Sequence, residues 1–242
     1  MAIVLGLGLR GHYAFNPPYL LLALDVLFFW GVTPFVAYIS ARSYLTSGSF
    51  TLLLVSLAFI VGVPFSIADG LSANSSPNVS VIFGALGLLF SSTMQLLGSA
   101  HASFGTSSIG SEKRKARLVM SYGLVFFISA LVMVLALLPA FPPFFVQATG
   151  VTTIDQVVYS LVIAFFLVSG VLYLRLYLGS KNDILYMYAL ALLLFSIGSF
   201  GLTQQLVFGD VVVWIGRASL FAGTLYFLSA LLQARTESSI KG

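Results

Sequence analysis

The sequence predicts an all-α, polytopic membrane protein, a single seven-transmembrane helix bundle over residues 1–242. Of these residues 59% are hydrophobic and only 7% are charged, whereas soluble domains carry about 25% charged residues. Seven stretches hold the roughly 20 mostly apolar residues that a spanning helix needs. Lysine and arginine gather on one side of these stretches, as they do in multi-pass proteins of the cell membrane.

The seven predicted spans follow one another through short connections. They lie at about 19–40, 50–69, 79–100, 117–139, 156–178, 184–207 and 210–233. Only Phe208 and Gly209 separate the last two spans, which predicts a tight antiparallel hairpin. Six spans with one re-entrant segment are the alternative. The first residues lack a basic segment and hold only a short apolar run, so we expect no cleaved signal peptide.

Basic residues predict the orientation of the bundle. With seven spans, nine of the eleven lysines and arginines fall on one side: Arg42, Lys113, Arg114, Lys115, Arg117, Arg175, Lys181, Arg235 and Lys241. Because short cytoplasmic connections are enriched in such residues, we place the C-terminus in the cytoplasm and the N-terminus outside. Two N-x-S sequons, at Asn74 and Asn78, fall on a predicted outer connection and are candidate glycosylation sites.

The connection between the fourth and fifth predicted spans, PAFPPFFVQATGVTTIDQ, is rich in proline and aromatic residues. Its prolines end the fourth span, because proline cannot donate the backbone hydrogen bond of a helix. Thr153 and Gln156 have the spacing of a capping box that opens the fifth span. We expect this connection to rest on the bundle as a lid, with a binding loop as the alternative.

Several functions are excluded by the residue types that the sequence lacks or places elsewhere. There is no cysteine, so disulfides, thiolate zinc sites and cysteine nucleophiles are absent. Every lysine falls in a connection or in the tail, which leaves none to form a retinal Schiff base within the bundle. The two histidines, His12 and His101, belong to opposite membrane faces and cannot hold a haem together.

The remaining polar residues predict neither catalysis nor nucleic-acid binding. No catalytic motif is present, and the acidic residues fall in different connections rather than in a pair. The basic residues are too few and scattered for a surface that follows phosphates. We therefore expect no enzyme activity, no cofactor and no metal site. His101 is expected to be an interfacial side chain, with a pH-sensitive switch as the alternative.

Six polar or charged residues converge on the outer third of the predicted bundle: Asp25, Asp69, Gln204, Gln205, Asp210 and Arg217. A charge inside the membrane costs at least about 2.5–3.5 kcal/mol on insertion scales, so it should face the interior and have a partner. Asp25 and Arg217 lie at similar depths, on spans that are neighbours in a closed ring. We expect them to approach each other directly, through water, or through a glutamine amide of this layer.

The pair of Asp25 and Arg217 has two interpretations. It either fixes helix packing alone or belongs to an outward-open pocket for a small ligand, because a buried ion pair by itself decides neither. Small residues four apart in the last span, Ser219 with Gly223 and Ala218 with Ala222, predict close helix contact beside the pair.

The second half of the chain resembles a known family. The segments LYMYALALLLFSIGSFGLTQQLVFG (185–209) and WIGRASLFAGTLYFLSALLQARTES (214–238) are similar to the last two spans of the seven-helix sensor modules of archaeal and bacterial PAS-containing histidine kinases. Shorter likenesses at 44–62, 78–92 and 150–158 extend the resemblance over most of the chain. Asp155 stands where the family pattern has a basic residue, so no ligand contact is carried over.

The resemblance implies a membrane sensor that signals to a cytoplasmic protein. Family members continue into a signalling domain, whereas this sequence ends at Gly242, so we expect a stand-alone sensor or receptor-like module without its own kinase domain. It would detect a small molecule, lipid or quinone through the outer polar layer. Its protein partner would contact the basic connection of Lys113, Arg114, Lys115 and Arg117, or the tail. The main alternative is a non-catalytic accessory subunit of a larger membrane complex, surrounded by lipids and partner subunits; a small transporter comes third.

Overall fold

The computed structural model describes residues 15, 17, 19–105, 110–138 and 141–240, with side chains as far as Ala234. Seven described helices are long and apolar enough to cross a membrane. They are Leu20–Ser47, Phe50–Ser72, Pro77–Phe104, Ser111–Ala136, Thr153–Ser180, Asp183–Leu202 and Val211–Ala234. The chain is therefore an all-α bundle with seven candidate spans.

The first span is divided into three pieces. A short helix α2 (Leu20–Asp25) leads into a π-helical turn (Val26–Trp30), which is followed by α3 (Gly31–Ser47). Pro34 lies in the first turn of α3 and lacks the amide hydrogen that would bond the carbonyl of Trp30. The wider π turn lies directly before this point, a kind of irregularity that is frequent at functional sites. It sets the direction of the helix directly after Asp25.

The other spans are α4 (Phe50–Ser72), α5 (Pro77–Phe104), α6 (Ser111–Ala136), α7 (Thr153–Ser180), α8 (Asp183–Leu202) and α9 (Val211–Ile240). Helix α6 begins six residues before the predicted fourth span. The charged residues ahead of that span form its first turns, because Glu, Lys and Arg are good helix formers. The hydropathy pattern predicts only the apolar part of this helix and not its charged first turns.

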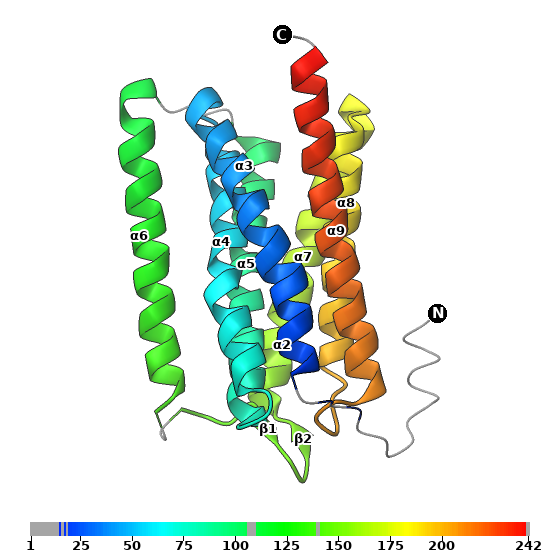
Figure 1. Cartoon of the computed structure of the whole chain (residues 1–242). Helices are drawn as coiled ribbons and strands as arrows, with labels where there is room; N and C mark the ends of the chain where they lie inside the picture. The colour runs from blue at the N-terminus through cyan, green and yellow to red at the C-terminus, as the bar shows by residue number, and fades with distance from the viewer. Residues whose placement is uncertain (1–14, 16, 18, 106–109, 139–140, 241–242) are drawn as a thin grey trace.

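Six of the seven spans form a closed ring. Around it, α3 contacts α4, α4 contacts α5, α5 contacts α7, α7 contacts α8, α8 contacts α9, and α9 returns to α3. Helix α6 packs on the outside of the ring, mainly against α4 and α3, and stands apart at the left of Figure 1. Of its most apolar 18-residue stretch, only 11% is buried within the structure. A sequential ring of seven helices, as the sequence suggested, is therefore not formed.

Helices α8 and α9 pack closely through glycines. A Cβ atom added to Gly198 would lie 2.7 Å from the carbonyl oxygen of Gly216, and one added to Gly223 would lie 2.6 Å from the ring of Phe195. Gly223 thus belongs to the close contact that the sequence predicted. Ala218, from the other predicted pair, is exposed instead, because the α8-facing side of α9 passes through positions 216 and 223.

The connection between α8 and α9 is longer than predicted. Helix α8 ends at Leu202 and α9 begins at Val211, so Gln204 and Gln205 lie in a loop and not on a helix. The amides of these two residues bond to the carbonyls of Gly201 and Leu202, at 3.3 Å each, which tightens the chain into turns. The loop is held further by the amide of Val151, which donates to the carbonyl of Gln205 over 3.2 Å.

A small antiparallel hairpin covers the end of the bundle opposite the C-terminus (Figure 1). Its strands are β1 (Phe145–Val146) and β2 (Gly150–Val151). The amides of Phe144 and Phe145 both donate to Oδ1 of Asn78 in α5, each over 2.9 Å. Both phenylalanine side chains are buried, so the segment rests on the bundle in the manner of a lid. We call this end of the molecule the hairpin end.

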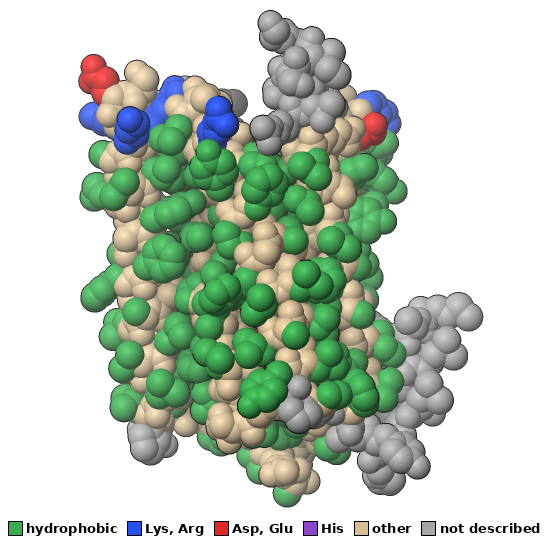
Figure 2. Space-filling view, in the orientation of Figure 1, with side chains coloured by type: hydrophobic (Ala, Val, Ile, Leu, Met, Phe, Trp, Pro, Cys, Tyr) green, Lys and Arg blue, Asp and Glu red, His purple; other side chains and the backbone are tan. Residues whose placement is uncertain are grey.

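The opposite end carries the described basic side chains other than Arg217, and we call it the basic end. Figure 2 shows them gathered there above a side surface that is largely hydrophobic. They are Arg42, Lys113, Arg114, Lys115, Arg117, Arg175 and Lys181. Apolar sides of this kind are what a multi-pass membrane protein requires.

Candidate functional site

A cavity of about 80 Å³ lies inside the six-helix ring. Its described lining comes from every span of the ring and from no residue of α6. Three lining residues carry charged groups: Asp25, Asp69 and Arg217. Nine lining residues are aromatic: Phe29, Phe59, Phe65, Phe83, Tyr159, Phe166, Phe195, Phe221 and Phe227. Since one buried water needs about 10–15 Å³, the cavity has room for several waters or for a small ligand.

Asp25 enters the cavity from the end of α2, directly before the π turn. Its side chain is only 3% exposed. Gly70 of α4 makes room for it, because a Cβ atom at Gly70 would come within 3.3 Å of Oδ2 of Asp25. This oxygen makes no hydrogen bond with any residue that the structure describes. A buried carboxylate oxygen without a partner is costly, and it is therefore a candidate ligand contact.

Asp69 lies near the end of α4 and is held by α5. The hydroxyl of Ser80 donates to its Oδ1, and its Oδ2 lies 3.1 Å from the position that a Cβ atom at Gly84 would occupy. The hydroxyl oxygen of Tyr159 lies 3.8 Å from the same position. Glycine at position 84 therefore leaves room for both the carboxylate and the phenol at the cavity wall.

Ser80 is also the third residue of the second sequon. Its side chain is fully buried and engaged with Asp69, and the amide oxygen of Asn78 holds the hairpin segment. The second sequon is thus built into the packing of the hairpin end. Asn74, in the turn between α4 and α5, is exposed.

Arg217 reaches the cavity from the second turn of α9. Its guanidinium carbon lies 5.6 Å from the ring centroid of Trp214, a cation–π distance, and the indole nitrogen of Trp214 donates to the carbonyl of Phe15 over 2.6 Å. Arg217 interacts electrostatically with Asp25 and Asp69 but forms no salt bridge within 4.0 Å with either carboxylate. The predicted approach of Asp25 and Arg217 therefore takes the form of a shared cavity and not of direct contact.

The three other residues of the predicted polar layer divide between the cavity and the loop that follows α8. Gln205 lines the cavity, is 3% exposed, and its Nε2 has no hydrogen-bond partner among the described residues. Gln204 lies outside the lining and donates to the hydroxyl of Thr203 over 3.0 Å. Asp210 also lies outside and caps α9, where its Oδ1 accepts from the amide of Val212 over 3.2 Å. Four of the six residues therefore meet at one cavity.

Sequence reasoning missed two neighbours of this cavity, Tyr159 and the buried Asp155 one turn before it. The side chain of Asp155 is fully buried, and neither carboxylate oxygen bonds to a described residue. The predicted capping box at Thr153 and Gln156 is not formed. Instead Thr152 caps α7 by accepting from the amide of Asp155 over 3.5 Å. The spacing of Asp155 and Tyr159, four residues apart in an apolar helix, is the sequence feature that could have pointed to them.

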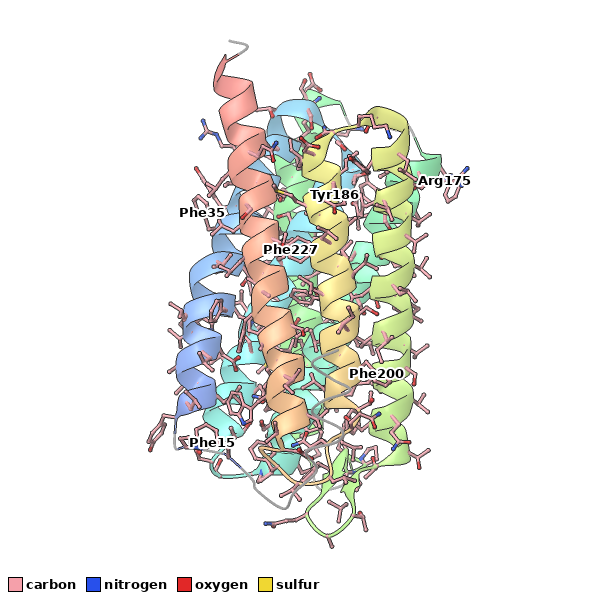
Figure 3. All side chains as sticks on the ribbon, turned by 90° about the vertical axis from the view of Figure 1, so that its right-hand side faces the viewer. Phe15, Phe35, Arg175, Tyr186, Phe200 and Phe227 are labelled. Carbon is pink, nitrogen blue, oxygen red and sulfur yellow. The ribbon has the colours of Figure 1, made fainter. Side chains whose placement is uncertain are left out.

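A hydrogen bond connects the central cavity to a second hollow. The hydroxyl of Tyr188 donates to Oε1 of Gln95 over 2.7 Å, and both side chains are buried. Gln95 lines the central cavity, whereas Tyr188 lines a groove of about 1100 Å³ on the side of the basic end. Phe227, midway along α9 in Figure 3, packs with its centroid 4.7 Å from those of Tyr188 and Phe59. Phe59, Tyr188 and Phe227 thus form an aromatic layer between the two hollows.

The basic end uses some of its polar residues for its own structure. The ring nitrogen Nδ1 of His101 lies 3.1 Å from the hydroxyl of Thr51, while His12 lies outside the described residues. Arg114 donates to the carbonyls of Leu45 and Thr46 at 3.1 and 2.5 Å, and so caps the end of α3. The other three basic residues of the predicted partner contact, Lys113, Lys115 and Arg117, are exposed. Across the described residues, no three His, Cys, Asp or Glu side chains cluster as a metal site would require.

Comparisons of the chain with protein-family models, with curated proteins and with solved structures found no match.

Proposed function

We propose that the chain is a membrane sensor or receptor-like module that binds a small ligand in the central cavity. The observation that carries this proposal is the pair of buried polar atoms at the cavity wall, Oδ2 of Asp25 and Nε2 of Gln205, that bond to no described residue. Most buried polar groups in proteins are paired, and each unpaired one costs about 1–3 kcal/mol. A ligand with polar groups would satisfy them.

The position of Arg217 supports a binding role over a packing role. A pair that only fixed two helices would gain most from direct contact between the charges. Here the guanidinium lies over the Trp214 ring, and the two carboxylates line the same cavity without touching it. Aromatic walls with a few converging polar groups are the usual composition of a ligand site.

The bond between Gln95 and Tyr188 provides a route by which the ligand state could reach the basic end. A ligand that shifts the aromatic layer would change this bond and, through it, the shape of the groove beyond. Following the positive-inside rule, we place the basic end in the cytoplasm and the hairpin end outside the cell membrane. The exposed Lys113, Lys115 and Arg117 then form the surface for a cytoplasmic signalling partner. The resemblance to kinase sensor modules agrees with this assignment.

Native mass spectrometry of the full chain, purified in mild detergent, tests the proposal. We compare the wild type with Arg217→Leu and, as the matched control, with Arg175→Leu. Arg175 is exposed on α7, lines neither hollow, and points away from the ring in Figure 3. A bound small molecule should accompany the wild type and the control and be lost from the Arg217 variant. Arg217→Gln replaces Arg217→Leu if the latter does not elute as a monodisperse protein.

Two results would contradict the proposal. One is a bound molecule that persists at the same occupancy in the Arg217 variant. The other is stoichiometric co-purification of membrane subunits without any bound small molecule, which would favour the accessory-subunit function.

A further inference from the structure

We infer that the ligand of the central cavity is a small organic monocation, a protonated primary amine with a short apolar body. This inference rests on the proposed function and adds the chemistry of the ligand to it. It follows from the charge balance of the cavity, the hydrogen-bonding groups on its wall, and its size.

The charge balance of the cavity favours a cation. Among the described lining residues, the carboxylates of Asp25 and Asp69 face a single guanidinium, that of Arg217. Charges within a membrane need partners, so one positive charge on the ligand would balance the lining. A carboxylate or phosphate ligand would add to the excess of acids.

The wall offers several acceptors and little to hold an anion. An ammonium group has three N–H donors and no acceptor. Oδ2 of Asp25 makes no bond to a described residue, and Oδ2 of Asp69 lies beside Gly84 near the Tyr159 hydroxyl. The one lining guanidinium, that of Arg217, is placed over the Trp214 ring.

The aromatic wall and the small volume define the rest of the ligand. Rings of phenylalanine and tyrosine attract organic cations over their faces and bury an alkyl body. The cavity measures about 80 Å³, less than the roughly 150 Å³ that admits benzene. A body of a few carbon atoms therefore fits this volume. A bare metal ion is disfavoured because it needs several converging oxygen ligands, and the described residues form no such group.

Binding of methyl-, ethyl-, propyl- and butylammonium chloride to the full chain in detergent tests the inference. Thermal unfolding is followed at pH 7 and constant ionic strength, with the matched alcohols and carboxylates as neutral and anionic controls. At least one alkylammonium ion should raise the unfolding temperature in a saturable way, and the controls should not. Asp25→Asn and Asp69→Asn should each raise its half-saturating concentration about tenfold or more, because each removes a buried charge partner.

Two further variants keep the test sensitive where a loss of charge prevents folding. Gly84→Ala places a methyl group 3.1 Å from Oδ2 of Asp69 and leaves all charges in place, so it should also weaken binding. Gly123→Ala on the outer helix α6, where nothing lies within 4 Å, is its control and should bind as the wild type does. Arg217→Gln should also weaken ammonium binding, because without the guanidinium the two carboxylates of the cavity cannot both stay ionised.

The outcomes separate this inference from the proposed function. Saturable binding of an alcohol or a carboxylate that Gly84→Ala weakens would overturn the cation while leaving a ligand site in the cavity. Alkylammonium binding that none of the cavity variants changes would also overturn it. If no probe of any charge stabilises the chain, the amine inference fails, and the native mass spectrum of the Arg217 variants still decides the proposed function.

Discussion

Replacing Gly216 by alanine should push α9 away from α8 and destabilise the bundle. A Cβ atom at this position would lie 2.7 Å from the carbonyl oxygen of Gly198 and 3.1 Å from Cα of Gly201. Both neighbours are backbone atoms, so no side chain can turn aside. The helices must separate by about 0.7 Å to bring the 2.7 Å contact to the ordinary 3.4 Å.

The expected loss of stability combines two opposing effects. Overpacking of this kind costs about 1–3 kcal/mol, while alanine gains about 0.8–1 kcal/mol over glycine in a helix interior. The net loss is therefore up to about 2 kcal/mol, which corresponds to a fall of a few degrees in the unfolding temperature for a chain of this size. The next residue is Arg217, so the same shift should also reduce ligand occupancy.

Thermal unfolding of the detergent-purified chain, read by fluorescence-detected size-exclusion chromatography, measures this change. Gly123→Ala is the matched control, because it makes the same substitution within a helix where nothing lies within 4 Å. An unfolding temperature of Gly216→Ala equal to or above that of Gly123→Ala would refute the close backbone contact.

Two other predictions concern the layer between the hollows and the hairpin end. Tyr188→Phe removes the donor to the buried Gln95 and should cost about 1–3 kcal/mol in thermal unfolding, whereas Tyr186→Phe, at an exposed position, should cost little; equal losses would argue against the buried bond. Asn78→Ala frees two backbone amides of the hairpin segment and should speed limited proteolysis there. Asn74→Ala, at an exposed turn position, should not, and unchanged cleavage of the Asn78 variant would contradict its role as an anchor.

The sequence predicts the number and order of the spans well, because hydropathy alone decides which segments can lie in lipid. It does not predict which spans touch. The fourth predicted span is apolar on all sides, and such a helix gives no sign of the face that it buries. The closed ring of six spans, with α6 outside it, depends on small residues such as Gly70 and Gly84, whose role is visible only once their neighbours are known.

For the candidate site too, the sequence predicts the depth of charged residues in the membrane but not how their side chains pack. Asp25, Asp69 and Arg217 could be placed in one layer because alternating helix direction relates position to depth. The sequence predicts the same layer for Gln204 and Asp210. In the structure, however, Gln204 lies in the loop after α8 and Asp210 caps α9. The burial of Asp155 was not predicted, because a carboxylate in a first helical turn is usually a cap or a dipole partner.

Ligand retention by a variant with a filled cavity tests the central claim most directly. Gly62 lines the cavity, and a Cβ atom there would meet nothing within 4 Å, so Gly62→Leu adds bulk inside the ring without changing a charge. Gly123→Leu adds the same bulk on α6, outside the cavity lining. In native mass spectra we predict a bound small molecule on the wild type and on Gly123→Leu, and none on Gly62→Leu. Equal occupancy in all three proteins would contradict a ligand site at the centre of the ring.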